Sequence, residues 1–314
     1  METKYFRGVM FCLIAATSWG GMFPVMTSAL TKMDPFNFTA IRYGIAVIAF
    51  LVLLVAKEGF GALSLKGERV LLVWLFGTAG FAGFGFLVFL GQQLAGPTGA
   101  LTASIMVATM PLLSLPVNWL LRDVRPPVLS WAFMLLSFSG VVLVITKGDF
   151  ARVLAEPHSY GANILLILGS LGWVIYTIGA SFFPKWSPYR YTAMTTLLGL
   201  TSILATTFVL IAVDYIQVPS VLAVVSVVPH LAYMSLIAAF VAVLSWNFGN
   251  KIITPMNGIL FQNVVPLTGF TVSALTGTIP TKVQILGACI TGVALILNNL
   301  YQRQRAAANA RPNP

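Results

Sequence analysis

The sequence has very few acidic side chains, and all of them lie outside its long apolar stretches. Asp and Glu account for 8 of 314 residues, and charged residues of both signs make up 8%, whereas about a quarter of a typical soluble protein is charged. Apolar residues make up 58%, more than a water-soluble chain of this length can bury. The composition excludes an ordinary soluble domain. It indicates a membrane protein whose interior chemistry uses aromatic rings, amides, hydroxyls and one cation.

The sequence also lacks the residue patterns of common membrane enzymes. Its two cysteines, Cys12 and Cys289, lie in the first and last apolar stretches, so a structural disulfide is not expected. It has no metal-ligand spacing, no pair of aspartates in adjacent apolar stretches, no convincing nucleophile–histidine dyad and no phosphate-binding glycine loop. We therefore expect no enzyme activity, no metal, no cofactor and no ATP-driven pump in this chain.

Long apolar stretches take up most of the chain. A membrane-spanning helix needs about 20 apolar residues, and these stretches do not alternate as the strands of a membrane barrel would. The predicted fold class is an all-α polytopic membrane protein with ten transmembrane helices. The predicted spans are Gly8–Leu30, Phe36–Ala56, Val70–Leu90, Gly99–Leu121, Val128–Thr146, Gly161–Phe183, Tyr191–Val213, Val228–Phe248, Met256–Gly277 and Val283–Leu300.

The positive charge follows the predicted topology and is not gathered into a patch for nucleic acid. The net charge is +10. With the N-terminus in the cytoplasm, the cytoplasmic segments hold 13 Lys and Arg residues and the external segments hold 4. This asymmetry obeys the positive-inside rule. It predicts a multi-pass protein of the cell (inner) membrane with both termini cytoplasmic and no nucleic-acid partner.

Landmarks of the first half recur in the second half at offsets of 154, 153, 155 and 152 residues. The matched pairs are Trp19 with Trp173, Pro35 with Pro188, Pro111 with Pro266, and Gly140 with Gly292. Each half holds five predicted spans, and an odd number places the halves in opposite orientations. We predict two inverted five-helix repeats, residues 1–155 and 156–314, with a short basic cytoplasmic tail on the second. Two such halves are suited to alternating access.

This ordered set of features resembles the EamA-type branch of the drug/metabolite transporter superfamily, over about residues 8–300. The residues that carry the resemblance are Trp19-Gly20, Arg42, Pro111, Trp246-Asn247 and Pro266. The resemblance implies ten helices in inverted repeats and a small metabolite, such as an amino acid, as substrate. The family often has Gly-Glu after the fourth and ninth spans. Here Arg122-Asp123 and Thr276-Gly277 stand there, so no role of that Glu carries over.

Arg42 is the one fully charged residue embedded in a predicted span. It stands six residues after Phe36, about 9 Å along a helix, and a charge within the membrane is costly enough to mark a functional candidate. Two interpretations stay open. Arg42 either contacts a substrate carboxylate, or it has a structural role, reaching the interface or capping carbonyls of a neighbouring helix.

Aromatic and amide side chains in the spans are candidates for a substrate site between the halves. Paired tryptophans offer flat faces for stacking, and buried amides need partners that a polar substrate can supply. Ordinary packing, membrane anchoring and interhelical hydrogen bonds are the alternatives. The predicted substrate-binding residues are Trp19, Phe23, Arg42, Phe81, Phe84, Trp173, Tyr176, Trp246, Gln262 and Asn263.

Prolines and glycines within the spans predict bends or close packing. Pro111 and Pro266 occupy equivalent positions and are predicted hinges, because proline kinks helices; fixed bends that shape the cavity are the alternative. Gly77, Gly80 and Gly83 share one face of the third span, which favours close packing over a flexible gating helix.

These features predict a secondary transporter that exports a small metabolite, with an amino acid, first of all an aromatic one, as substrate. Because no acid lies in a span, a uniporter or exchanger that uses the solute's own gradient is the simplest expectation. A drug or organic-cation carrier is the alternative within this class, and a non-transporting membrane enzyme or receptor is the alternative outside it. The expected partners are the small-molecule substrate and the lipid bilayer, and the sequence leaves the oligomeric state open.

Overall fold

The computed structural model describes residues 2–96, 99–146, 148–149, 158–275 and 281–309, and within these ranges every regular element is a helix. The boundary predicted at residue 155 and the Thr276-Gly277 pair lie outside the described residues. The elements are α1 (Glu2–Gly20), α2 (Met22–Ala29), α3 (Pro35–Glu58), η1 (Phe60–Leu63), α4 (Val70–Gly77), η2 (Thr78–Gly83), α5 (Phe84–Leu94), α6 (Gly99–Val107), α7 (Met110–Arg122), α8 (Val128–Thr146), α10 (His158–Gly179), η4 (Ala180–Phe182), α11 (Pro188–Ala212), α12 (Val221–Ser226), α13 (Val228–Ala232), η5 (Tyr233–Val241), α14 (Ala242–Ile253), α15 (Pro255–Ile259), η6 (Leu260–Asn263), α16 (Val264–Leu275) and α17 (Lys282–Asn309).

Seven helical segments are long and apolar enough to cross a membrane by length and composition. They correspond to the first four and the sixth to eighth predicted spans, and they are Thr3–Ala29, Pro35–Glu58, Val70–Leu94, Thr102–Arg122, Gly161–Phe182, Pro188–Ala212 and Val228–Ile253. The apolar stretches of α8 and α17 are shorter, Val128–Gly140 and Lys282–Asn298. The protein is therefore a polytopic helical membrane protein, and the count of ten spans stays a prediction.

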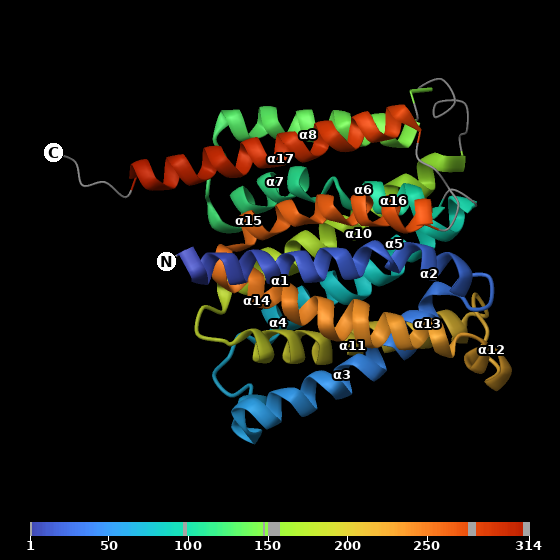
Figure 1. Ribbon diagram of the computed structural model, residues 1–314. Coiled ribbons are helices and arrows are strands. Elements are labelled where there is room, and N and C mark those ends of the chain that lie inside the picture. Colours follow the sequence, from blue (N-terminus) through green and yellow to red (C-terminus); the bar gives the residue numbers. More distant parts are fainter. Residues whose placement is uncertain (1, 97–98, 147, 150–157, 276–280, 310–314) are drawn as a thin grey trace.

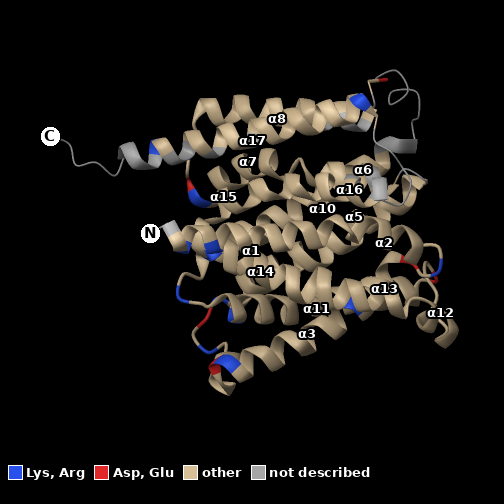
Figure 2. Cartoon of the chain, viewed as in Figure 1, with Lys and Arg blue, Asp and Glu red and all other residues tan. Residues whose placement is uncertain are grey.

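The helices lie side by side in one bundle, with α8 and α17 along one edge and α3 along the opposite edge (Figure 1). Charged side chains collect at the two ends of this bundle and are sparse between them (Figure 2). The N-terminus and the last turns of α17 lie at one end, here called the N-terminal end; α2, α12 and α13 lie at the other, the far end. The uncharged band between the ends suits the hydrocarbon core of a bilayer.

Helices from the two halves of the chain pack on one another in matched pairs. In the first half α1 packs on α14 and α16, and in the second half α10 packs on α5 and α7. α3 packs on α11, and α8 packs on α17. The contacts of α1 with α14 and α16 thus correspond to the contacts of α10 with α5 and α7.

The helices that begin the second and seventh predicted spans start with the same local structure. The Asp34 carboxylate accepts backbone N–H groups at 3.0 and 2.9 Å at the start of α3, and the Ser187 hydroxyl accepts one at 3.0 Å at the start of α11. A proline follows each cap. Capping oxygens and a first-turn proline both favour a helix start, so the sequence fixes where these two helices begin.

The fourth and ninth predicted spans are interrupted just before Pro111 and Pro266. α6 ends at Val107 and α7 begins at Met110, while the 3₁₀ turn η6 separates α15 from α16. Each proline stands in the first turn of a new helix, where its missing N–H breaks no hydrogen bond. The predicted kinks are therefore junctions between consecutive helices.

Two π-helical stretches occupy matching places in the halves. The stretches η2 and η5 begin 155 residues apart, at Thr78 and Tyr233. A π-helix turn is wider than an α-turn and is frequent at functional sites. Hydrophobic periodicity did not predict either stretch.

The glycines of the third predicted span pack closely at two of three positions. A Cβ added at Gly77 would lie 2.0 Å from the Thr195 carbonyl oxygen, and one added at Gly80 would lie 2.6 Å from the Tyr176 ring. A Cβ on Gly83 would meet only the Thr78 carbonyl of its own helix. Close packing therefore explains Gly77 and Gly80 but not Gly83.

Candidate substrate pocket

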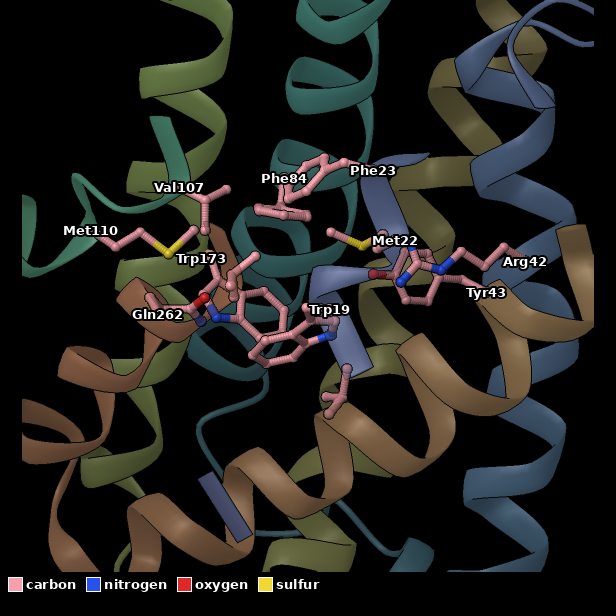
Figure 3. A pocket seen from close by; sticks show the side chains of 12 residues that line it. Trp19, Met22, Phe23, Arg42, Tyr43, Phe84, Val107, Met110, Trp173 and Gln262 are labelled. Atoms are coloured by element: carbon pink, nitrogen blue, oxygen red, sulfur yellow. The ribbon is translucent and has the colours of Figure 1, made fainter. Parts of the chain in front are cut away.

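A pocket at the centre of the bundle is formed by helices of both halves (Figure 3). Its empty volume is ≈ 320 Å³ when gaps and space open to solvent are counted, but the space that a water-sized sphere can enter is only ≈ 10 Å³. The lining side chains therefore nearly fill the pocket in this conformation. We call it the central pocket, and it is lined by Trp19, Met22, Phe23, Arg42, Tyr43, Phe84, Val107, Met110, Trp173, Val243, Gln262 and Val265. Six of the ten predicted substrate-binding residues line it: Trp19, Phe23, Arg42, Phe84, Trp173 and Gln262.

The two equivalent tryptophans meet in this pocket. The ring centroids of Trp19 and Trp173 are 5.2 Å apart and the rings are nearly perpendicular, at 86°, a favoured edge-to-face arrangement. Phe84 lies 5.5 Å from Trp173. The pocket therefore presents both the faces and the edges of aromatic rings.

The indole N–H groups of these two residues differ. Trp19 Nε1 donates to the Ala238 carbonyl oxygen in η5 at 2.8 Å. Trp173 is only 4% exposed, and its Nε1 has no hydrogen-bond partner among the residues that the structure describes. A buried donor without a partner is costly in a folded protein, so Trp173 has a free hydrogen bond to offer in the pocket.

Arg42 is buried in α3, 1% exposed, and it does not reach the interface. Its Nε donates to the Met234 carbonyl oxygen in η5 at 3.0 Å, and its guanidinium carbon lies 4.8 Å from the Tyr43 ring centroid and 5.7 Å from that of Phe89. Within the described part of the chain its Nη1 has no partner, and no carboxylate is within ion-pair distance. Arg42 thus caps a carbonyl, as one interpretation expected, and keeps a free charged donor, as the other requires.

The adjacent amides Gln262 and Asn263 point in different directions. Gln262 lines the central pocket, whereas Asn263 Nδ2 approaches the Ser137 hydroxyl of α8 at 3.5 Å. Consecutive residues of a helical turn project about 100° apart, so one pocket cannot receive both. Asn263 bridges helices, which was the alternative reading of this pair.

The other three predicted residues stand behind the pocket wall. Phe81 packs 5.0 Å from Tyr176, and Trp246 Nε1 donates to the Thr177 hydroxyl at 3.0 Å. The Tyr176 hydroxyl accepts from Asn247 Nδ2 at 2.6 Å. These contacts support the wall and leave Phe81, Tyr176 and Trp246 outside the central pocket.

Sequence reasoning missed several residues of this region. Tyr43 and Met22 line the pocket, and Gln92 is buried and donates from Nε2 to the Phe23 carbonyl oxygen at 2.8 Å. The position of Gln92 gives a signal in retrospect, because Asn247 follows it by 155 residues and is also a buried amide, with Nδ2 donating to the hydroxyls of Tyr176 and Thr192. Tyr43 is next to Arg42, and a charged residue in a span often has an aromatic neighbour over which it lies.

A larger hollow lies at the N-terminal end, between the ends of α7, α10, α14 and the start of α11. Its empty volume is ≈ 800 Å³, including space open to solvent. Arg122 and Lys251 stand in its wall, with Tyr191, Asn247 and Asn250 deeper in the bundle. We call it the vestibule. Tyr191 stacks on Tyr176, 5.3 Å away, so aromatic side chains separate the vestibule from the central pocket.

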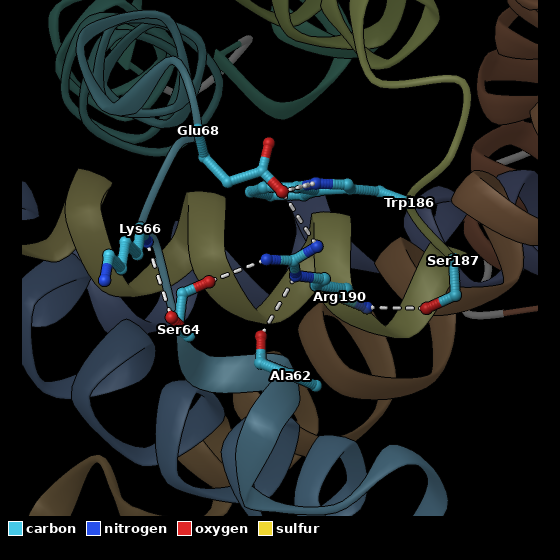
Figure 4. Close-up of polar contacts among 7 residues, drawn as sticks. All are labelled: Ala62, Ser64, Lys66, Glu68, Trp186, Ser187 and Arg190. Atoms are coloured by element: carbon cyan, nitrogen blue, oxygen red, sulfur yellow. Dashed lines mark hydrogen bonds and ion pairs between the residues drawn. The ribbon is translucent and has the colours of Figure 1, made fainter.

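A charged brace stands at the same end (Figure 4). Arg190 Nε and Nη2 donate to the carbonyl oxygens of Ala62 and Ser64 at 3.0 and 2.7 Å, and Nη1 pairs with Glu68 at 3.0 Å. Trp186 lies 4.3 Å from the guanidinium carbon and donates to the same carboxylate at 2.9 Å. The start of α11 is thereby fastened to the loop after α3.

The far end has a neutral counterpart of this brace. Asn37 Nδ2 donates to the Gln217 carbonyl oxygen at 3.0 Å. Asn37 and Arg190 are 153 residues apart, and so are their acceptors Ser64 and Gln217. The same contact is therefore made at both ends, with an amide at one and a guanidinium at the other.

The polar groups of the central pocket are suited to binding a small solute. The described residues contain no group of three or more His, Cys, Asp or Glu side chains that could hold a metal ion. The free groups are donors on Arg42 and Trp173, surrounded by aromatic and apolar side chains. Such a set suits reversible capture of a small anionic or zwitterionic solute with an apolar body.

Comparison with known proteins agrees with this geometry. The model of the EamA-like transporter family matches residues 6–146 and 161–300. Two similar proteins from Bacillus subtilis (strain 168) are "Uncharacterized transporter YrdR", 38% identical over 301 residues that cover 96% of this chain and 94% of that one, and "Uncharacterized transporter YyaM", 28% identical over 276 residues that cover 86% of each.

A solved crystal structure of a protein with 17% sequence identity has a similar fold, with a TM-score of 0.70 over 95% of this chain and 98% of that one. Family, relatives and pocket agree on a multi-pass membrane transporter for a small molecule, and the resemblance based on Trp19, Arg42 and the paired prolines is confirmed. The chain belongs to the EamA-like transporter family.

Proposed function

We propose that this transporter is a secondary carrier that exports an amino acid, with an aromatic amino acid as the first candidate, by alternating access between two inverted halves. It would lie in the cell (inner) membrane with both termini in the cytoplasm, as the distribution of Lys and Arg favours. The N-terminal end of the bundle is then the cytoplasmic end, and the vestibule is the cytoplasmic entrance.

The observation that carries the proposal is the buried guanidinium of Arg42 in a pocket formed by both halves. Its Nη1 has no partner among the described residues, and an uncompensated buried charge is strongly unfavourable. A substrate carboxylate would compensate it. The aromatic rings of Trp19, Phe84 and Trp173 would hold the apolar part of the same substrate.

The inverted arrangement is supported by contacts that recur at a fixed offset. The braces of Asn37 and Arg190, the π-helices and the interruptions before Pro111 and Pro266 each occur once per half. In an inverted repeat, each state places one half in the conformation that the other half adopts in the opposite state. Contacts made in both halves at once are therefore constant through transport, and contacts made in one half alone are those that change.

The indole hydrogen bond is made in one half alone, so we expect it to change during transport. Trp19 is bonded to the Ala238 carbonyl, and Trp173 is not bonded. The position 155 residues before Ala238 is Gly83, in η2. In the outward-facing state we expect Trp173 to donate to the Gly83 carbonyl while Trp19 is released, with the helix junctions at Pro111 and Pro266 as hinges.

The test is flux of radiolabelled phenylalanine and tryptophan into liposomes that contain the purified protein, driven by the concentration gradient alone. Saturable flux above that of protein-free liposomes is expected. Flux that needs an imposed pH or voltage step would keep the carrier and overturn the uncoupled mechanism. If neither amino acid is transported under any of these conditions, the aromatic amino-acid assignment is wrong.

A further inference from the structure

We infer that the central pocket recognises a carboxylate and a flat apolar body, and that it does not need the ammonium group of an amino acid. Aromatic monocarboxylates without an amino group are then ligands of the same site. This inference rests on the proposed function and deepens it by stating which part of the substrate is read.

The free polar atoms of the pocket are hydrogen-bond donors. Arg42 Nη1 and Trp173 Nε1 lack partners, and both side chains are more than nine-tenths buried. They come from different helices, α3 and α10, and Figure 3 draws them on different sides of the central space. Unsatisfied donors select a ligand that brings acceptors, and beside the charged Arg42 guanidinium a carboxylate is the strongest acceptor.

The rest of the wall favours a flat apolar body. Trp19 and Trp173 stand edge to face at 5.2 Å, and Phe84 lies 5.5 Å from Trp173. Met22 and Met110 add flexible thioether side chains, which adapt to the outline of a ring.

The central pocket has no anionic partner for an ammonium group among the described residues. The described lining residues include no Asp or Glu, and their remaining polar groups are the neutral Gln262 amide and the Tyr43 hydroxyl. An ammonium group that leaves water without an anionic partner loses its hydration, and the adjacent positive charge of Arg42 opposes it. Contact with aromatic faces returns part of this loss only. The ammonium group of an amino acid is therefore not expected to increase its affinity for the central pocket.

The experiment compares three ligands of equal ring size by calorimetric titration of the purified protein in detergent. Phenylpropanoate has the ring and carboxylate, phenethylamine has the ring and ammonium, and phenylalanine has all three. We expect phenylpropanoate to bind with a dissociation constant equal to or lower than that of phenylalanine, and phenethylamine to bind at least tenfold more weakly.

Two variants assign the carboxylate to Arg42. Arg42→Gln should weaken phenylpropanoate binding at least tenfold and should not weaken phenethylamine binding, because it removes a positive charge that opposes the ammonium group. Lys57→Gln removes the same charge from the exposed end of the same helix and should leave both unchanged. A melting transition close to that of the unchanged protein serves as the check on folding.

Each result bears on one claim. Phenethylamine binding as tightly as phenylalanine, or failure of all three ligands to bind, would overturn the inference. Binding in the expected order without flux in liposomes would leave the recognition of carboxylate and ring intact and overturn the transport proposal for these compounds. Flux of phenylalanine together with tighter binding of phenethylamine than of phenylpropanoate would support the transport proposal and overturn the inference about the carboxylate.

Discussion

The two halves of the chain differ at the residues that line the central pocket. In the first half, Trp19 and the buried Arg42 both donate hydrogen bonds to carbonyl oxygens of the π-helix η5. In the second half, the Trp173 indole N–H has no partner among the described residues, and Thr195 occupies the position equivalent to Arg42. The helix caps, the braces and the helix junctions, by contrast, are present in both halves. The scaffold is thus duplicated, while the charged group that could bind a solute, Arg42, occurs in the first half alone. A duplicated frame can change shape symmetrically, but a small asymmetric solute needs an asymmetric site.

The largest expected effect comes from making the halves alike at the arginine position. Arg42→Gln should lower kcat/KM for a carboxylate substrate by roughly 10- to 150-fold, the loss of a charge-assisted hydrogen bond of about 1.5–3 kcal/mol. The matching change Thr195→Val removes a hydroxyl that donates to the Tyr191 and Thr192 carbonyl oxygens of its own helix, and it should alter flux by less than about threefold. Initial rates in liposomes measure both. An equal loss for carboxylates and amines would instead make Arg42 a structural residue.

Close packing between halves is tested by two glycines. Gly77→Ala would place a methyl 2.0 Å from the Thr195 carbonyl oxygen and should lower the free energy of unfolding by about 1–3 kcal/mol. Gly44→Ala in α3 meets no atom within 4 Å and should leave stability unchanged or slightly raised. Thermal unfolding in detergent gives both values. A drop of the same size for Gly44→Ala would mean that the loss does not arise from packing.

The tryptophans test whether the two halves exchange conformations. Trp19→Phe removes a hydrogen bond of the present state, at a cost of about 0.5–1.5 kcal/mol, whereas Trp173→Phe removes a donor that has no partner among the described residues. Labelling of Ser181→Cys in the vestibule wall by an impermeant maleimide, with Cys12 and Cys289 replaced by Ala, reports how often the vestibule is open. We expect lower labelling for Trp19→Phe and higher labelling for Trp173→Phe. A shift in the same direction for both would contradict the exchange.

The smallest effect is expected from the braces at the two ends. Arg190 and Glu68 are 20% and 28% exposed, and partly exposed ion pairs contribute about 0.2–1 kcal/mol. Glu68→Gln should therefore lower the melting temperature slightly and leave flux unchanged. Because salt screens exposed charges, the difference from the unchanged protein should shrink as the ionic strength rises. A large loss of flux would show that the brace moves during transport.

Features that depend on local sequence were predictable here. The caps at Asp34 and Ser187, the embedded charge of Arg42 and the matched tryptophans are visible as residue types at fixed spacing. The direction of individual side chains was not. Gln262 and Asn263 are adjacent, and only the helical phase set by η6 decides that one faces the pocket and the other faces α8.

The two π-helices could not be predicted either, for a different reason. Their sequences, from Thr78 and from Tyr233, have no shared signature, because the wider turn is selected by what packs against it. The close contact of Gly77 with α11 and the bonds from Trp19 and Arg42 to η5 are tertiary. Burial of Gln92 has the same origin, since its partner carbonyl at Phe23 comes from another helix.

The uncoupled mechanism proposed from the lack of acidic side chains in the predicted spans has an electrical consequence. A carrier that moves no accompanying proton transfers only the charge of its cargo. For a zwitterion that charge is zero, and the membrane voltage has no influence on its distribution. A monocarboxylate anion carries one negative charge, and an inside-negative potential of 100 mV favours its exit by about 2.3 kcal/mol, about 50-fold at equilibrium. The same uncoupled pocket would therefore be an equilibrating carrier for amino acids and a voltage-driven exporter for their deaminated relatives.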